Sequence, residues 1–142
     1  NAAQNDLGHL WSLGIEERVT FVSGISTEQL VRHYAEAEIA VVPSVYEGFG
    51  LPAGEAMACG VPVVSTRGGA LPEVVGDAGL LVPVRDSDAI ADKVGQLFNN
   101  PAQRQSLAAA GRNRIESLFC WQRVARQITD YYQQQVLNNA DC

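Results

Sequence analysis

Two short apolar runs, with a glycine-containing segment between them, constrain the fold of this chain more than any other feature. Residues 39–42 are apolar, mostly β-branched and followed by Pro43, which is typical of a strand buried on both faces of a parallel sheet. Residues 62–65 form a second such run. Between them lie a glycine loop at 47–50 and a helix-like stretch at 51–60. The sequence therefore predicts a strand, a loop, a helix and a strand, a unit that binds ligands outside the carboxyl ends of parallel strands.

Two carboxylates belong to this loop and helix. Glu47 lies on the loop and Glu55 lies inside the predicted helix, with seven residues between them. Gly48 and Gly50 allow a sharp turn and a close approach to a ligand, because they lack a Cβ atom. Pro52 suits the first turn of a helix, where a missing N–H is no loss. We expect both carboxylates to face a ligand. On spacing alone, a solvated loop charge and a side chain that complements the helix dipole are the alternatives.

The residues around the two glutamates resemble a known family. The similarity lies in Glu-Gly-Phe-Gly-Leu-Pro at 47–52, Glu-Ala-Met-Ala-Cys-Gly-Val-Pro-Val-Val at 55–64 and Gly-Gly-Ala-Leu-Pro-Glu-Val-Val at 68–75. These stretches resemble the C-terminal, donor-binding domain of retaining glycosyltransferases with the two-domain GT-B fold (group 1, family 4 type), and the resemblance extends over residues 13–132. It implies an α/β fold, with a Rossmann-like parallel sheet and helices on both faces. The chain would then be the C-terminal half of a GT-B enzyme, without its first two strands.

The resemblance implies binding of a nucleotide diphosphate sugar, such as a UDP-, GDP- or ADP-sugar, in an enzyme that transfers a hexose with retention of configuration. It implies that Glu47, as the catalytic glutamate, contacts sugar hydroxyls and that Glu55 accepts hydrogen bonds from the ribose. Backbone N–H groups near Gly50 and Leu51 are candidates for stabilising the leaving diphosphate. No cofactor and no obligatory metal are implied. The predicted donor-binding residues are Glu47, Gly48, Phe49, Gly50, Leu51 and Glu55, with Gly24 and Ile25 at the nucleotide base.

The composition is that of an ordinary globular chain. At 142 residues we expect a single domain over 1–142, here a partial nucleotide-sugar-binding domain. A net charge of −6 argues against nucleic acid as a partner, since surfaces that bind it are basic. The three cysteines lack a C-x-x-C spacing and there are two histidines, so we predict no metal site. No apolar run reaches the ~20 residues of a membrane span, and no export signal is recognisable. We therefore predict a cytoplasmic chain without a transmembrane segment.

The elements outside the central segment are predicted from periodicity and capping residues. We expect helices at 2–13, 27–37, 70–75, 87–98, 101–118 and 121–137, and further strands at 18–22 and 79–83. Asp86 or Ser87 is expected to cap the helix that ends at Phe98. The arginines of the 101–118 helix are expected on a solvated face; they are Arg104, Arg112 and Arg114. The resemblance implies that the 121–137 helix crosses to an absent N-terminal acceptor domain.

The resemblance also implies a gap in the sheet. In the strand order 3-2-1-4-5-6 of such domains, the strand at 18–22 is the third and lies two strands away from the one at 39–42. We therefore expect the chain to be part of a longer enzyme and, as such, inactive alone. Either its first strand pairs differently, or self-association fills the uncovered edge, because an open strand edge is an association site.

Two other functions are open from the sequence. The GT-B architecture also serves sugar-nucleotide epimerases, although the glutamate-loop-glutamate pattern is not expected there. The other alternative is a non-catalytic nucleotide-sugar-binding or interaction module. Titration with sugar donors tests the interaction module, since intact Glu47, Gly48, Gly50 and Glu55 predict saturable binding.

Overall fold

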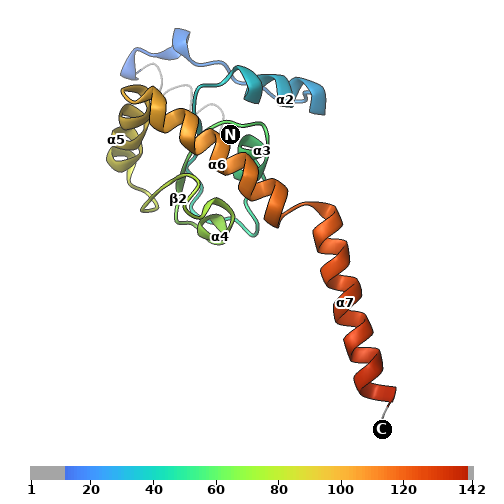
Figure 1. The fold of residues 1–142 in the computed structure, drawn as a ribbon. Helices are drawn as coiled ribbons and strands as arrows, with labels where there is room; N and C mark the ends of the chain where they lie inside the picture. Colours follow the sequence, from blue (N-terminus) through green and yellow to red (C-terminus); the bar gives the residue numbers. More distant parts are fainter. Residues whose placement is uncertain (1–11, 141–142) are drawn as a thin grey trace. The chain divides into compact units, whose positions relative to one another are not determined.

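The computed structural model describes residues 12–140, and the chain divides into two compact units, residues 1–30 and 31–142 (Figure 1). In the first unit, a short 3-10 helix, η1 (Glu16–Arg18), is followed by residues without regular secondary structure and by the start of α2 (Thr27–Glu36). The helix predicted at 2–13 lies almost entirely outside the described residues. The helix predicted at 27–37 is confirmed as α2.

The second unit contains a three-stranded parallel sheet. The strands are β1 (Ala40–Val42), β2 (Val63–Thr66) and β3 (Leu80–Val82), and they lie side by side in the order β1-β2-β3. In this register Val41 lies opposite Val64, and Ser65 lies opposite Leu81. All four residues of β2 are buried, as the continuous apolar run predicts for a central strand. The strands predicted at 39–42, 62–65 and 79–83 are thus confirmed.

The strand predicted at 18–22 is wrong. Arg18 closes the 3-10 helix, and the residues after it form no strand. A strand must pair its backbone N–H and C=O groups with a neighbouring strand, and no described segment pairs with these residues. Their apolar side chains are accordingly exposed, with Phe21 at 62% and Val22 at 48%. The β-branched, aromatic pattern was correct for a strand, but the partner that such a strand needs is not found among residues 12–140.

Five helices accompany the sheet: α3 (Leu51–Ala58), α4 (Leu71–Val75), α5 (Ser87–Phe98), α6 (Pro101–Leu118) and α7 (Trp121–Ala140). The Asp86 side chain caps α5 by accepting a hydrogen bond from the Ala89 N–H at 2.9 Å, as predicted. Asn100 caps α6 in the same way, through the Gln103 N–H at 3.0 Å. The last helix continues past the predicted end at 137.

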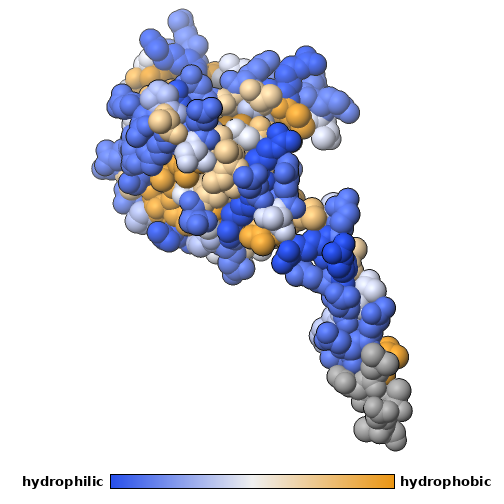
Figure 2. All heavy atoms as spheres, in the orientation of Figure 1, coloured by the Kyte–Doolittle hydropathy of each residue, from blue (hydrophilic) through white to orange (hydrophobic). Residues whose placement is uncertain are grey.

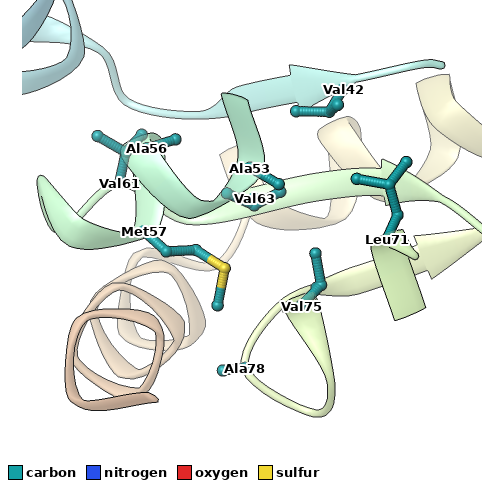
Figure 3. Packing of buried hydrophobic residues seen from close by; sticks show 9 residues of the cluster. All are labelled: Val42, Ala53, Ala56, Met57, Val61, Val63, Leu71, Val75 and Ala78. Atoms are coloured by element: carbon teal, nitrogen blue, oxygen red, sulfur yellow. The ribbon is translucent and has the colours of Figure 1, made fainter. Parts of the chain in front are cut away.

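The hydrophobic core lies between the sheet and the helices α3, α4 and α6 (Figure 3). Met57 extends from α3 toward α6, where a Cβ atom at Gly111 would lie 3.3 Å from the Met57 Cγ. Small residues on the facing helix thus let α6 pack closely against α3. The remaining labelled residues are Val42, Ala53, Ala56, Val61, Val63, Leu71, Val75 and Ala78. This packing fixes α3, the helix that carries Glu55, against the sheet.

Two of the three arginines predicted on a solvated face of α6 instead bind the ends of other helices. Arg114 donates from Nε to the Val74 carbonyl at 2.9 Å and from Nη2 to the Glu73 carbonyl at 2.8 Å. Arg104 donates from Nη1 to the last carbonyls of α5. Both cations thereby satisfy C-terminal carbonyl groups, where the helix dipole is negative. Arg112 alone matches the prediction, in an exposed pair with Glu116.

The surface of α7 is mixed. The face of this helix that Figure 2 shows is largely hydrophilic, yet several of its large apolar side chains are exposed, with Trp121 at 84% and Val136 at 67%. Whether they cover an acceptor domain stays a prediction. Within residues 12–140, no helix combines the length and apolar character needed to cross a membrane. The same residues contain no cluster of three or more His, Cys, Asp or Glu side chains suited to a metal ion.

Candidate functional site

The loop that follows β1 carries Glu47 and is tightly hydrogen-bonded. Ser44 donates from Oγ to Oε1 of Glu47 at 2.7 Å. The Ser44 carbonyl in turn accepts a hydrogen bond from the Thr66 hydroxyl at the end of β2. The backbone carbonyl of Glu47 accepts from the Ala70 N–H at 2.9 Å. Both the backbone and the half-buried side chain of Glu47 are thus held by neighbouring residues.

The glycine pair after β2 supports this loop from the other side. A Cβ atom at Gly68 would lie 2.6 Å from the carbonyl oxygens of Ser44 and Val45. Gly69 has a φ of +59°, and a Cβ atom there would lie 2.2 Å from the Glu47 carbonyl oxygen. Only glycine therefore lets the two backbones approach this closely. The turn at 68–69 is thus in direct contact with the Glu47 loop.

The N-terminus of α3 offers unpaired N–H groups. Gly50, the N-cap residue, has a φ of +96°, and its carbonyl accepts hydrogen bonds from Ala53 and Gly54, both at 3.1 Å. No group among residues 12–140 accepts a hydrogen bond from the backbone N–H of Phe49, Gly50 or Leu51. The first N–H groups of a helix point outward and lie at the positive end of its dipole. This position suits an anion.

Glu55 lies one turn into α3, and its side chain is exposed. Its Oε2 atom lies 3.4 Å from the Tyr34 hydroxyl, which donates to it. Burial raises the pKa of Tyr34, and the negative charge of Glu55 raises it further. The two residues are 21 positions apart, so the spacing of residues within one helix does not reveal this contact.

A cavity of about 630 Å³ opens beside Glu55. Its walls are almost entirely apolar, and Glu55 is the charged side chain among them. Phe49 lines it and packs edge-on against Phe119, with ring centroids 5.7 Å apart. A cavity of this size accommodates a small organic ligand. Its lining residues are Phe49, Leu51, Gly54, Glu55, Ala58, Ile115, Phe119, Trp121 and Val124.

The predicted site residues are thus placed in three groups. Phe49, Leu51 and Glu55 line the cavity. Glu47, Gly48 and Gly50, from the loop before α3, are not among the residues that line it. The third group, Gly24 and Ile25, belongs to the unit formed by residues 1–30, where Gly24 has a φ of +65°. Base recognition by these two residues stays a prediction.

Parallel strands, a glycine loop at their carboxyl edge and a helix that begins there define an α/β protein with a Rossmann-like fold. Comparison with known proteins narrows the class. The model of the family described as glycosyl transferases group 1 matches residues 6–114, so the chain belongs to this family.

Curated relatives are similar over most of the chain. An MMP alpha-(1->4)-mannosyltransferase from Mycolicibacterium hassiacum is 44% identical over 92% of this chain and 32% of its own length. The O-antigen chain mannosyltransferase B of Escherichia coli is 40% identical over 87% of this chain and 33% of its own. The chain thus spans about a third of the length of these relatives.

Solved structures agree with the fold. A sucrose-phosphate synthase from Thermosynechococcus elongatus superposes with a TM-score of 0.86 at 39% identity, over 95% of this chain and 34% of that chain. HepE of Anabaena, solved in complex with UDP, has a TM-score of 0.85 over 93% of this chain and 36% of that one. At 24% identity the second likeness shows the fold alone. The α/β fold, as part of a GT-B glycosyltransferase, is therefore confirmed.

Proposed function

We propose that this chain is the donor-binding portion of a retaining glycosyltransferase that transfers a hexose from a nucleotide diphosphate sugar to an acceptor. The observation that carries the proposal is a pair of carboxylates near the start of α3, each of which has one oxygen that accepts no hydrogen bond from residues 12–140. Glu47 uses one oxygen for Ser44, and Glu55 uses one for Tyr34. Among residues 12–140, nothing donates a hydrogen bond to the second oxygen of either carboxylate. Membership of the glycosyltransferase family and the mannosyltransferase names of the relatives support the same assignment.

Each carboxylate is suited to hydroxyl recognition. A carboxylate accepts hydrogen bonds from hydroxyl groups in charge-assisted contacts, which are stronger than neutral ones. We assign the sugar hydroxyls to Glu47, on the loop, and the ribose hydroxyls to Glu55, beside the cavity. Neither role requires proton transfer.

The leaving diphosphate is assigned to the start of α3. Negative charge builds up on this group as the sugar–phosphate bond breaks, and preorganised donors stabilise the charge without moving. The N–H groups of Gly50 and Leu51 stand at the positive end of the helix. In this proposal the reaction needs no cofactor and no obligatory metal ion.

The first experiment is a calorimetric titration of the 142-residue chain with UDP-glucose, GDP-mannose and ADP-glucose, compared with its Glu55→Ala variant. Loss of one or two hydrogen bonds to a charged acceptor costs roughly 1.5–3 kcal/mol each. We therefore expect the donor that binds to bind about 10- to 150-fold more weakly for one lost bond. Glu36→Ala, at an exposed glutamate on α2, is the matched control and is expected to bind as the unmodified chain does. Equal affinity of the Glu55→Ala variant would contradict the assignment.

A second proposal concerns a protein partner that binds the outer edge of β1. Among the described residues no strand pairs with the outer edge of β1, and an open edge of this kind pairs with another chain. We propose that this edge meets either the remaining strands of a longer enzyme or a second copy of the chain. The molar mass in solution tests self-association: a dimer that dissociates on Val41→Pro supports it, and a monomer at high concentration contradicts it.

A further inference from the structure

Tyr34 joins the helix before the sheet to the helix that carries Glu55. It belongs to α2, and its ring is partly buried against the hydrophobic core. Its hydroxyl lies 3.4 Å from Oε2 of Glu55 and 3.4 Å from the carbonyl oxygen of Pro52. Both acceptors lie in the first turns of α3. The ring is thus held by packing, and its polar end is aimed at the start of α3.

Glu55 has few other constraints. Its side chain is exposed, and an exposed glutamate in a helix samples several rotamers. Among residues 12–140, the Tyr34 hydroxyl is the one group that donates a hydrogen bond to this carboxylate. By binding Oε2, it leaves Oε1 available beside the cavity. A preset rotamer lowers the conformational entropy that the Glu55 side chain loses when a ligand binds.

We propose that Tyr34 is a positioning residue for Glu55, which orients the carboxylate toward the two neighbouring hydroxyls of a ribose. The proposal rests on the proposed function, because it takes Glu55 as the ribose contact. In this scheme Tyr34 acts through Glu55 and not on the ligand: its single hydroxyl proton is directed at the two acceptors of α3, Glu55 Oε2 and the Pro52 carbonyl, both at 3.4 Å. The hydroxyl also keeps its proton well beyond neutral pH, because burial and the charge of Glu55 raise the pKa of Tyr34.

The test measures ribose recognition directly. UDP, GDP and ADP are titrated into the chain by calorimetry, and the one that binds is compared with its 2′-deoxy form. The variant Tyr34→Phe keeps the ring in the core and removes only the hydroxyl. We expect it to weaken the ribonucleotide about three- to tenfold, the equivalent of one hydrogen bond, and to weaken the deoxynucleotide less. Tyr132→Phe, an exposed tyrosine on α7, is the matched control and is expected to have no effect.

A double-mutant cycle separates positioning from a general structural role. In the Glu55→Ala background, Tyr34→Phe is expected to change affinity no further, because the carboxylate that it orients is gone. An equal loss in both backgrounds would mean that Tyr34 acts independently of Glu55, and would overturn the proposal. If Glu55→Ala lowers affinity and Tyr34→Phe does not, positioning is refuted and the proposed function stands. If Glu55→Ala has no effect, or none of the three nucleotides binds, both are refuted.

Discussion

The contact between Gly69 and the Glu47 loop predicts a large effect of the variant Gly69→Ala. Two costs add at this position. The φ of +59° is unfavourable for alanine, by roughly 1–2 kcal/mol. In addition, a Cβ atom would lie 2.2 Å from the Glu47 carbonyl oxygen and 2.9 Å from its backbone nitrogen. Both neighbours are backbone atoms that hydrogen bonds and the chain hold in place, so the loop itself must move.

Gly60 separates the two costs. It has a φ of +75°, but a Cβ atom there would have no neighbour within 4 Å. The Gly60→Ala variant therefore carries the conformational strain without the overlap, and loss of unfolded-state entropy offsets roughly 0.4–1 kcal/mol of it. We expect it to cost about 1 kcal/mol. The overlap adds roughly 1–3 kcal/mol for forced displacement of packed groups, so we expect Gly69→Ala to cost about 2–4 kcal/mol.

Urea unfolding of both variants, followed by circular dichroism, measures these free energies. The transition midpoint should fall further for Gly69→Ala, with an unchanged slope, since the surface exposed on unfolding is the same. Donor titration should also show weaker binding for Gly69→Ala, because the backbone of Glu47 is displaced, and little change for Gly60→Ala. Equal destabilisation by the two substitutions would refute the inference that the 68–69 turn supports the Glu47 loop.

Three further predictions concern stability. Arg114→Met removes the hydrogen bonds to the Val74 and Glu73 carbonyls and should cost roughly 1–3 kcal/mol in urea unfolding, whereas Arg112→Met, at an exposed pair, should change stability by less than about 1 kcal/mol. Arg85 is the described non-glycine residue with a positive φ, at 60°. Arg85→Gly should therefore increase the free energy of unfolding by up to about 1 kcal/mol and so raise the thermal midpoint. A lower midpoint would contradict the inference that the backbone of Arg85 is strained. The pKa of Tyr34 is raised by burial and by Glu55, so the unfolded chain loses this proton first. Stability should thus fall as pH rises above about 10, more steeply than in Tyr34→Phe; parallel pH profiles of the two proteins would contradict this.

Local patterns explain which elements were predictable from the sequence. The apolar run at 39–42 and the Asp86 cap depend on residues within a few positions, and both are confirmed. The segment at 18–22 has an equally good strand pattern, yet it forms no strand. A strand depends on a partner that its own residues do not encode. The sequence thus indicated that this segment favours a strand conformation, but not whether another strand pairs with it.

Long-range contacts explain what the sequence could not indicate. Arg114 donates to a carbonyl 40 positions away, and Tyr34 to a carboxylate 21 positions away. The spacing of either residue on its own helix indicates neither contact. Their roles follow from the packing of separate helices, which periodicity within one helix does not reveal. The glycine pair at 68–69 carried a usable signal, since adjacent glycines indicate a close backbone approach as well as a turn.

The two glutamates are held by different means, which affects how each responds to change elsewhere. Glu47 is fixed by its own backbone, through Ala70 and the glycine pair, and by Ser44 three residues before it. Glu55 is fixed by a helix that packs through Met57 against α6, and by one hydroxyl from α2. Changes in helix packing should therefore displace the Glu55 side chain first, whereas changes in the turn after β2 should displace Glu47. Because the two side chains have separate supports, the proposed ribose and sugar contacts can be disturbed one at a time.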